Sequence, residues 1–396
     1  MSRLVMACAL FWLGLASAWS GSLLAGGYGH RVWVDGQGLV WTQGANLQGQ
    51  LGNGGIDYRG TPQHPLGMAG ITQVASGLDH VLALKEDGTL WGWGYGDVGQ
   101  VGAAFRSTQV LDSLGISMLA PYAIERQPVQ VHVPPFAQQD MPLAEVAAGG
   151  RHSLALARDG TLWAWGRNSA GQLGLGDTFD RYLPARLQSL PGITNLAAGG
   201  NHSLALDGNG TLYAWGDNQA GQLGDDTQGQ RATPGMVPGL PPMATMAGGA
   251  SFTLAVDRSG QLWSWGANDA GQLGDGTTTP HSQPMAIPGA AGVMAVAAGR
   301  AHALALRRDG SIYAWGANEL GQLGQGDTQQ RLAPQQVQGL PKILAIACGD
   351  GFSMAQGADG VLYAWGDNRY MQLGPTKETG SLWLLPRATT AGKWPQ

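Results

Sequence analysis

Histidines recur at one position of a repeated motif, and this recurrence is the first feature of the sequence that suggests chemistry. The five residues at this position are His30, His80, His152, His202 and His302. Neutral imidazole is a common zinc ligand, but ligand nitrogens must lie about 2 Å from one ion, and positions related by a long repeat are too far apart. Phe252 and Phe352 fill the same position in two copies. We therefore predict that the position packs a flat ring and that no metal site is present.

No other reactive arrangement stands out in the chain. It has no nucleophile paired with a base, no cluster with metal-ligand spacing and no phosphate-binding loop. The net charge is −5 at pH 7 and lysines and arginines form no cluster, whereas phosphate binding needs concentrated positive charge. The sequence predicts a protein that is not an enzyme, has no catalytic or cofactor-binding residues and binds no nucleic acid.

A tetrapeptide, Gly-Gln-Leu-Gly or a close variant, sets the period of the chain. Its copies begin at Gly49, Gly99, Gly171, Gly221, Gly271, Gly321 and Met371, mostly 50 residues apart. A repeat of this length indicates an array of units that each bury a face against the next unit. Such an array grows by adding units, so 396 residues can form one domain.

Each unit has the pattern of a small antiparallel sheet. In the third unit, residues 152–156 alternate bulky and small side chains, which is typical of a strand. Asp159-Gly160 predicts a hairpin turn, and Trp163 and Trp165 share one face of the next strand. Seven such sheets fit a closed ring, whereas a linear array needs polar capping units that we do not find. We predict an all-β fold, a seven-bladed β-propeller of ~50-residue repeats.

Two further sets of recurring residues have structural explanations. Aromatic pairs such as Trp91/Trp93 and Trp263/Trp265 are expected to form the core between blades, because each ring buries a large area. Asparagines recur between glycines, and asparagine tolerates left-handed backbone and forms turns. The asparagines are Asn46, Asn168, Asn218, Asn268, Asn318 and Asn368. We interpret them as turn formers.

The complete repeat carries a family resemblance. It reads Gly-x-x-His-Ser-Leu-Ala-Leu, then Asp-Gly-x-Leu-Tyr/Trp-x-Trp-Gly-x-Asn-x-x-Gly-Gln-Leu-Gly. This pattern resembles the repeat of the regulator of chromosome condensation family, from about Leu24 to Pro386. The resemblance implies a seven-bladed propeller in which one blade is made from both ends of the chain.

The resemblance implies several different activities. The founding member of the family is a guanine nucleotide exchange factor for the small GTPase Ran and binds nucleosomes. Other relatives are a tryptophan-based light sensor and a secreted bacterial inhibitor of β-lactamase. The light sensor's Gly-Trp-Arg-His-Thr motif is absent, since Gly150 stands where tryptophan belongs before Arg151. No catalytic residues carry over from the family.

The N-terminus has the layout of a cleaved secretory signal. Arg3 precedes an apolar run from Leu4 to Leu15, and Ala16-Ser17-Ala18 supplies a cleavage site. The run is shorter than the ~20 residues of a membrane-spanning helix; a short anchor or a buried first strand is the alternative. We expect residues 1–18 to be a signal peptide and residues 19–396 to form one propeller domain. We expect this domain to be extracytoplasmic and monomeric and not to be inserted in a membrane. Cys348 is then the remaining cysteine.

An insertion interrupts the repeat between the second and third units. The spacing from Gly102 to Gly149 exceeds the spacing from Gly174 to Gly199 by 22 residues, which places the insertion at about 104–125. It is apolar for a loop, and a projecting hairpin with such side chains suits partner binding. The partner-binding residues that we predict are Phe105, Arg106, Leu111, Leu114, Met118 and Tyr122. The alternative is that the insertion folds back over the neighbouring blade.

Other departures from the repeat are smaller. Gln43 stands where the third unit has Trp165, which marks the first unit as the seam of the ring. Residues on the blade-edge turns vary while their neighbours repeat, so they are further candidates for binding. They are Asp79, Arg151, Arg300 and Asp350, and Tyr95, Arg167, Asp217 and Arg369.

These observations predict an exported, non-enzymatic scaffold. It binds a protein partner of unknown identity through the blade-edge loops and the 104–125 insertion. The alternatives are a guanine nucleotide exchange factor for a small GTPase, an inhibitor of an extracytoplasmic enzyme such as a β-lactamase, and an enzyme with its active site in the axial channel.

Overall fold

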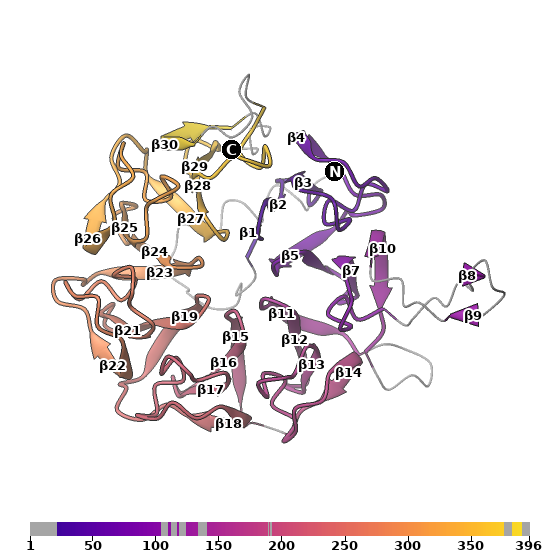
Figure 1. Ribbon diagram of the computed structural model, residues 1–396, viewed down its shortest axis with the longest axis horizontal. Helices are drawn as coiled ribbons and strands as arrows, with labels where there is room; N and C mark the ends of the chain where they lie inside the picture. The colour runs from indigo at the N-terminus through magenta and orange to yellow at the C-terminus, as the bar shows by residue number, and fades with distance from the viewer. Residues whose placement is uncertain are drawn as a thin grey trace, which may run out of the picture.

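Seven sheets of four strands each form a closed ring around a central axis (Figure 1). The computed structural model describes residues 22–103, 110–111, 117–118, 124–133, 141–188, 190, 192–375 and 382–389. Every regular element in these ranges is a strand. None of the described residues belongs to a helix that is long and apolar enough to span a bilayer. The predicted seven-bladed β-propeller is confirmed.

The blades are numbered in chain order, and the strands of each run from the axis outward. Blade 1 contains β1 (Leu24–Gly26), β2 (His30–Val34), β3 (Val40–Gly44) and β4 (Arg59–Gln63). Blade 2 contains β5 (Ile71–Ser76), β6 (His80–Lys85), β7 (Leu90–Tyr95) and β10 (Ile124–Val131). Blade 3 contains β11 (Leu143–Ala148), β12 (His152–Ala157), β13 (Leu162–Gly166) and β14 (Arg181–Arg186). Blade 4 contains β15 (Ile193–Ala198), β16 (His202–Asp207), β17 (Leu212–Gly216) and β18 (Arg231–Met236).

The remaining blades repeat this order. Blade 5 contains β19 (Met243–Gly248), β20 (Phe252–Asp257), β21 (Leu262–Gly266) and β22 (His281–Ala286). Blade 6 contains β23 (Val293–Ala298), β24 (His302–Arg307), β25 (Ile312–Gly316) and β26 (Arg331–Gln336). Blade 7 contains β27 (Ile343–Cys348), β28 (Phe352–Gly357), β29 (Leu362–Gly366) and β30 (Trp383–Ala388). The short strands β8 (Val110–Leu111) and β9 (Ser117–Met118) form a separate pair.

The expected blade made from both chain ends is wrong. Each sheet consists of four strands that follow one another along the blade's own chain segment, including β1–β4 and β27–β30. Residues 24–26 supply the inner strand of blade 1, and residues 383–388 supply the outer strand of blade 7, so neither blade lacks a strand. Blades 1 and 7 instead close the ring by lying side by side (Figure 1).

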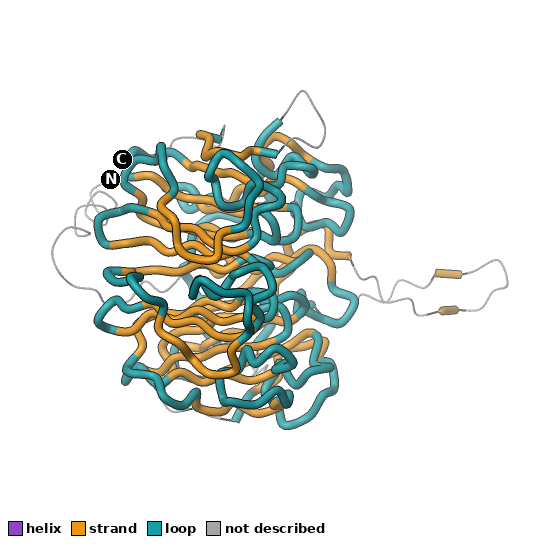
Figure 2. Tube along the Cα trace, turned by 60° about the vertical axis from the view of Figure 1, so that its left-hand side comes forward, coloured by secondary structure: helices purple, strands orange, loops and turns teal. Residues whose placement is uncertain are grey.

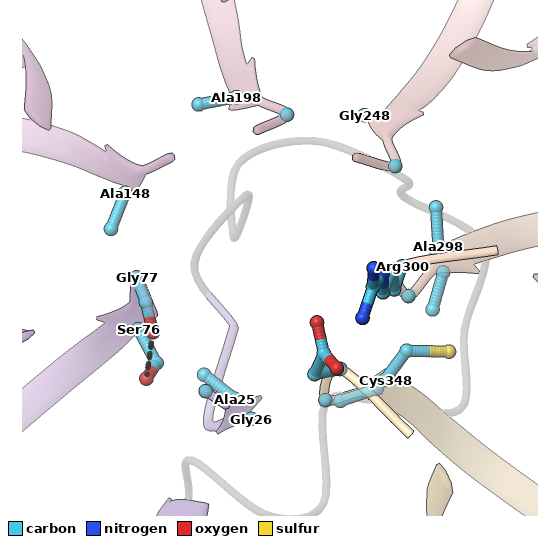
Figure 3. A pocket seen from close by; sticks show the side chains of 18 of the residues that line it. Ala25, Gly26, Ser76, Gly77, Ala148, Ala198, Gly248, Ala298, Arg300 and Cys348 are labelled. Carbon is cyan, nitrogen blue, oxygen red and sulfur yellow. Dashed lines mark hydrogen bonds between the residues drawn. The ribbon is translucent and has the colours of Figure 1, made fainter. Parts of the chain in front are cut away.

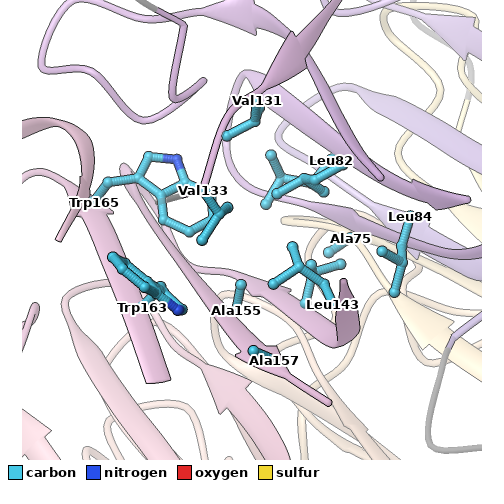
Figure 4. Close-up of a cluster of buried hydrophobic side chains, with 12 residues drawn as sticks. Ala75, Leu82, Leu84, Val131, Val133, Leu143, Ala155, Ala157, Trp163 and Trp165 are labelled. Carbon is cyan, nitrogen blue, oxygen red and sulfur yellow. The ribbon is translucent and has the colours of Figure 1, made fainter. Parts of the chain in front are cut away.

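Buried tryptophans hold neighbouring blades together, as predicted. Figure 4 shows one buried cluster that contains Trp163 and Trp165 of blade 3 together with Leu82 and Leu84 of blade 2. In six blades the second tryptophan of the pair also donates its Nε1 hydrogen to a glutamine carbonyl of the preceding blade, as Trp265 does to Gln222 at 3.0 Å. Each indole therefore combines burial of apolar area with a satisfied hydrogen bond.

The outer edge of every blade is protected against pairing with another sheet. Each outer strand contains a proline, which lacks an amide hydrogen and interrupts the hydrogen-bonding edge. These prolines are Pro62, Pro128, Pro184, Pro234, Pro284, Pro334 and Pro386.

The recurring asparagines fix the loop that carries the tetrapeptide. Asn218 is fully buried; its side-chain oxygen accepts the amide hydrogen of Leu223 at 2.9 Å. Its Nδ2 group donates to Asp225 and to Thr227. The equivalent asparagines accept the same amide hydrogen in five other blades. The prediction of turn formers is confirmed.

We expect Asn218→Ala to lower the free energy of unfolding by about 2–3 kcal/mol, because buried polar groups of the loop lose their partners. Urea unfolding followed by tryptophan fluorescence measures the change. Gln219→Ala, at the exposed neighbouring position, is the control and should stay within about 0.5 kcal/mol of the parent protein. Equal effects of the two substitutions would contradict the role of Asn218.

Candidate protein-binding face

The repeated histidines are structural. All five are buried, and in each of them Nε2 lies 2.9–3.1 Å from a serine or threonine hydroxyl of the next blade. Ser153, for example, donates its hydroxyl hydrogen to the carbonyl of Gln100 and so accepts from His80. The partner of His30 is Ser76 on the inner strand of blade 2, whereas the other four hydroxyls lie on the second strand of their blade. Burial lowers the pKa of His80 to about 3 and of His202 to about 4, so the rings are neutral.

The axial channel encloses a cavity of about 300 Å³ with a wall of mostly glycine and alanine. Figure 3 shows alanines and glycines from several blades around the opening, with Arg300 among them. Arg300 and Asp350 are the charged residues of the described lining. Cys348 also lines the wall, and burial raises the pKa of its thiol, so it is not a nucleophile at neutral pH. The described part of the lining presents no pair of acid and base for catalysis.

Backbone hydrogen bonds link the blades around the channel mouth. At six of the seven boundaries they join the turn between the first and second strands of one blade, which we call the inner turn, to the inner turn of the next blade. The bonds run from Tyr28 to Leu78, Leu78 to Gly150, Gly150 to Gly200, Gly200 to Gly249, Arg300 to Asp350 and Asp350 to Gly27, at 2.9–3.2 Å. The series crosses the boundary between blades 7 and 1, so it contributes to ring closure.

The inner turns and the long loops between the third and fourth strands lie on the same face of the ring, which we call the upper face. The amide of Tyr95 in a long loop donates to the carbonyl of Asp79 in an inner turn at 2.8 Å. Arg167 and Arg151 are joined in the same way. The structure therefore places both sets of predicted blade-edge residues on a single surface.

One part of the upper face is a charged cluster between blades 2 and 3. Arg151 lies 3.1 Å from the carboxylate of Asp97, and its guanidinium stacks 5.5 Å from the ring centre of Tyr95. Asp79 accepts a hydrogen bond from Gln50. Burial raises the pKa of Asp79, and Arg151 opposes this shift.

A second part is a tyrosine cluster across the boundary between blades 7 and 1. Tyr370 lies 5.8 Å from Tyr28 and 5.4 Å from Tyr58, measured between ring centres. All three are part-exposed. The hydrogen bond with Tyr28, together with partial burial, raises the pKa of Tyr370 to about 12. Next to it, Arg369 pairs with Asp367 at 2.9 Å.

The backbone under the tyrosine cluster is strained. Met371 adopts a φ of 60°, whereas the other six copies of the tetrapeptide place a glycine with positive φ at this position. A side chain in this conformation costs roughly 1–2 kcal/mol. Such strain is concentrated at functional sites.

Comparison with known proteins identifies the family. A model of the RCC1-like domain matches residues 21–288. Models of the regulator of chromosome condensation (RCC1) repeat match residues 309–356 and 294–322. This chain belongs to the RCC1-like family.

Solved structures share the whole RCC1-like ring. A chain in the crystal structure of Kap60 bound to yeast RCC1 (Prp20) is 23% identical, with a TM-score of 0.76 over 96% of this chain and 90% of that chain. Prp20p from Saccharomyces cerevisiae, described with its binding to Gsp1p and histones, is 26% identical, with a TM-score of 0.75 over 91% of this chain and 87% of its own.

Curated RCC1-like relatives match over shorter stretches. The ultraviolet-B receptor UVR8 of Arabidopsis thaliana is 33% identical over 171 residues, which is 43% of this chain and 34% of UVR8. The probable E3 ubiquitin-protein ligase HERC6 of Homo sapiens is 36% identical over 156 residues, 39% of this chain and 13% of HERC6. The matches thus span about a third or less of these relatives.

This RCC1-like propeller is not uniform around its upper face. Blades 4 and 5 present small polar or apolar residues at the turn positions, such as Asn201, Ser251 and Ala267. The charged and tyrosine clusters occupy an arc over blades 7, 1, 2 and 3. Asp350 and Arg369 belong to this arc, whereas Asp217 on blade 4 lies outside it. Six of the eight predicted blade-edge residues lie in this arc, whereas Asp217 on blade 4 and Arg300 on blade 6 do not.

The insertion of this RCC1-like propeller lies within blade 2, between β7 and β10, rather than between two units. Ile124 and Glu125 already pair with β7, so the insertion ends before them. Leu111 and Met118 belong to β8 and β9, an antiparallel pair that both views place outside the ring (Figure 2). The predicted residues Phe105, Arg106, Leu114 and Tyr122 lie outside the described residues.

Sequence reasoning missed the tyrosine cluster of the RCC1-like ring. A signal for it exists, because Tyr370 stands where three blades have Ala170, Ala220 and Ala270. The following residue, Met371, replaces the glycine of the tetrapeptide. Two adjacent departures in one copy mark that loop as different.

Proposed function

We propose that this protein is an exported, non-enzymatic scaffold that binds another protein through the arc of its upper face and the β8–β9 hairpin. The observation that carries this proposal is the concentration of part-exposed tyrosines and stacked arginine on one arc of a repetitive ring. Tyrosine and arginine are the residues that dominate protein–protein interfaces. The buried, neutral histidines and the small-residue channel support a role without catalysis.

Affinity capture with substitutions that copy other blades tests the proposal. Tyr370→Ala reproduces Ala170, and Arg151→Ser reproduces Ser251, so both keep residues that the fold already accepts. We expect the pair of substitutions to weaken retention of the partner at least tenfold, as for interface residues of these types. Unchanged retention would remove the arc from the binding surface.

A deletion confined to residues 104–123 tests the hairpin separately, because Ile124 begins β10. Loss of the partner in the deletion alone assigns binding to the hairpin. Circular dichroism and the urea midpoint of each variant control for folding.

Guanine nucleotide exchange is the second candidate, and the likeness to Prp20p over 91% of this chain favours it. Accelerated GDP release from a small GTPase in the presence of this protein would support exchange. Inhibition of an extracytoplasmic enzyme such as a β-lactamase is a narrower form of the scaffold proposal, and enzyme assays with the purified protein test it.

Export rests on residues 1–18 and has its own test. We expect the mature protein in an extracytoplasmic fraction to begin at Trp19. N-terminal sequencing of the protein from that fraction checks this, and an intact Met1 in a cytoplasmic fraction would contradict it.

A further inference from the structure

Large apolar side chains are exposed on the upper face at blade 1 and at its border with blade 2. Leu47 is 56% exposed, Tyr28 40%, Leu78 38% and Tyr58 37%. We call these four residues the blade-1 patch. Tyr28 and Leu78 belong to the inner turns of blades 1 and 2, and Leu47 and Tyr58 belong to the long loop of blade 1.

Direct contacts connect the members of the blade-1 patch. The amide of Tyr28 donates to the carbonyl of Leu78 at 2.9 Å, which fixes the two inner turns side by side. The ring of Tyr370 lies between the other two rings, 5.8 Å from Tyr28 and 5.4 Å from Tyr58. The patch is therefore a continuous surface, and exposed apolar surface of this kind marks interaction sites.

The loop that carries Leu47 also contacts a carboxylate. The side chain of Gln50 donates from Nε2 to Asp79 at 3.1 Å. Its Oε1 atom accepts the amide hydrogen of Gln48, the residue after Leu47, at 2.8 Å. Asp79 in turn directly follows Leu78 in the chain. One glutamine side chain thus holds the Leu47 loop against the carboxylate of Asp79.

The fold does not require large apolar side chains at these positions. In the other six blades the residues equivalent to Leu47 are polar, namely Asp97, Ser169, Gln219, Asp269, Glu319 and Arg369. The residues equivalent to Tyr28 and Leu78 are Gly150, Gly200, Ala250, Arg300 and Asp350. The loop around Ser169 keeps the same bonds as the Leu47 loop, because Asn168 and Gln172 accept amide hydrogens at 2.9 Å as Asn46 and Gln50 do. Large apolar side chains at these two positions are thus confined to blades 1 and 2.

The charges beside the patch leave Asp79 without an ion pair among the described residues. Arg151 is the nearby cation, but it already lies 3.1 Å from the carboxylate of Asp97. Burial raises the pKa of Asp79; Arg151 opposes this shift, and the negative charges of Asp350 and Asp97 add to it. A hydrogen bond from the neutral amide of Gln50 does not supply the missing positive charge. A cation from outside would complement this carboxylate.

We infer that the blade-1 patch docks an apolar segment of the partner protein that carries a lysine or arginine, and that this cation pairs with Asp79. The inference rests on the proposed protein-binding function and names the chemistry of the partner. Leu47, Leu78 and the tyrosines supply the apolar contact. Leu78 and Asp350 also line the axial cavity, so the docked segment lies at the channel mouth.

Site-specific photo-crosslinking in the full chain tests this inference. A benzophenone amino acid replaces Leu47 in one protein and Gln219, the equivalent residue of blade 4, in the control. Both proteins are irradiated in the cells that produce them. We expect an adduct with another protein from position 47 and none from position 219. The crosslinked peptide, mapped by mass spectrometry, should combine apolar side chains with a lysine or arginine.

A synthetic peptide with the mapped sequence then tests the ion pair in a double-mutant cycle. Asp79→Asn copies Asn201, and glutamine replaces the cationic residue of the peptide. We expect each change alone to weaken binding about tenfold, and the glutamine peptide to bind Asp79→Asn about as well as the cationic peptide does. Leu47→Ser, which copies Ser169, should also weaken binding about tenfold. Gln219→Ala is the control and should bind like the parent protein.

Several outcomes overturn the inference. They are an absence of adducts at position 47, equal adducts at positions 47 and 219, a mapped segment that is acidic or wholly polar, independent losses in the double-mutant cycle, and an adduct between two copies of this chain. If one of these occurs while Tyr370→Ala with Arg151→Ser still weakens capture, the inferred docking at the blade-1 patch is wrong and the upper-face proposal stands. If position 47 gives no adduct and that pair of substitutions leaves capture unchanged, both fail.

Discussion

Lowering the pH from 8 to 5 should cost this protein about 10 kcal/mol of stability, because five buried histidines cannot take up protons in the folded state. Burial lowers the pKa of His30, His80 and His152 to about 3, and that of His202 and His302 to about 4. In the unfolded chain each titrates near pH 6.5. Each histidine therefore lowers the free energy of unfolding by about 2 kcal/mol at pH 5.

The direction of this change in stability follows from which state, folded or unfolded, binds more protons. Between the folded and unfolded pKa values the unfolded chain binds the extra protons, so stability is complete above pH 6.5 and is lost as the pH falls toward 4. Aspartates such as Asp327 have lowered pKa values and add a further loss below about pH 4. Asp79 and Asp350 have pKa values raised by burial and act in the opposite direction. The free energy of unfolding of a typical domain is 5–15 kcal/mol, so the expected loss at pH 5 is most of that value.

The sequence itself supplies the variant that tests this cause. Where blade 5 has Phe252, the facing residue of blade 6 is Ala303, so the ring and its hydroxyl partner are replaced together. The double substitution His202→Phe with Thr253→Ala copies this pair. Urea unfolding at pH 8 and pH 5 should show that the double variant loses about 2 kcal/mol less than the parent protein. The same loss in both proteins would show that other groups cause the acid sensitivity.

Gln43→Ala is expected to lower the free energy of unfolding by about 3–5 kcal/mol, because it leaves a buried guanidinium uncompensated. Arg31 is fully buried and donates to Gln43 at 2.6 Å. Its guanidinium stacks 4.9 Å from the ring centre of Trp33, but its Nε and Nη1 atoms have no hydrogen-bond partner among the described residues, and burial lowers its pKa to about 9. Gln43 also donates to the carbonyls of Gly60 and, across the ring closure, Met371.

A double-mutant cycle separates the buried charge from general disruption. Arg31→Met with Gln43→Leu replaces the pair by apolar residues of similar size, and we expect it to recover most of the stability lost by Gln43→Ala. Chemical denaturation of Arg31→Met, Gln43→Leu and the double variant, each compared with the parent protein, measures the coupling. If the double variant is as unstable as Gln43→Ala, the buried arginine is not the cause.

The sequence predicted the ring because the features that build it repeat. The residues that form each hairpin, such as Asp159-Gly160 and Trp163, are close together in the sequence and recur at a constant period. The number and the type of the blades therefore follow from the repeat pattern. Closure is different, because it depends on β1, which has three residues and no motif of its own. It pairs with β2 through only three residues, Leu24 to Gly26.

The candidate site was predictable only in part. Variation at Asp79 and Arg151 was visible in the sequence, and these residues meet on one face because the inner turns and long loops end there. The contact of Tyr370 with Tyr28 joins residues from opposite ends of the chain, which no local pattern can indicate.

Because the ring closes without a shared strand, new chain ends can be placed at other blade boundaries by circular permutation. Every blade is a contiguous segment, so among the described residues blades 1 and 7 are joined by side-chain packing and backbone hydrogen bonds and share no strand. The boundary between these blades is therefore one of seven similar boundaries, distinguished by Gln43 and Arg31 rather than by topology. A circular permutant that starts at another boundary would contain the same seven complete sheets. During synthesis, six blades can be complete before the seventh meets the first, so the final contact is a loop-closure event over nearly the full length of the chain.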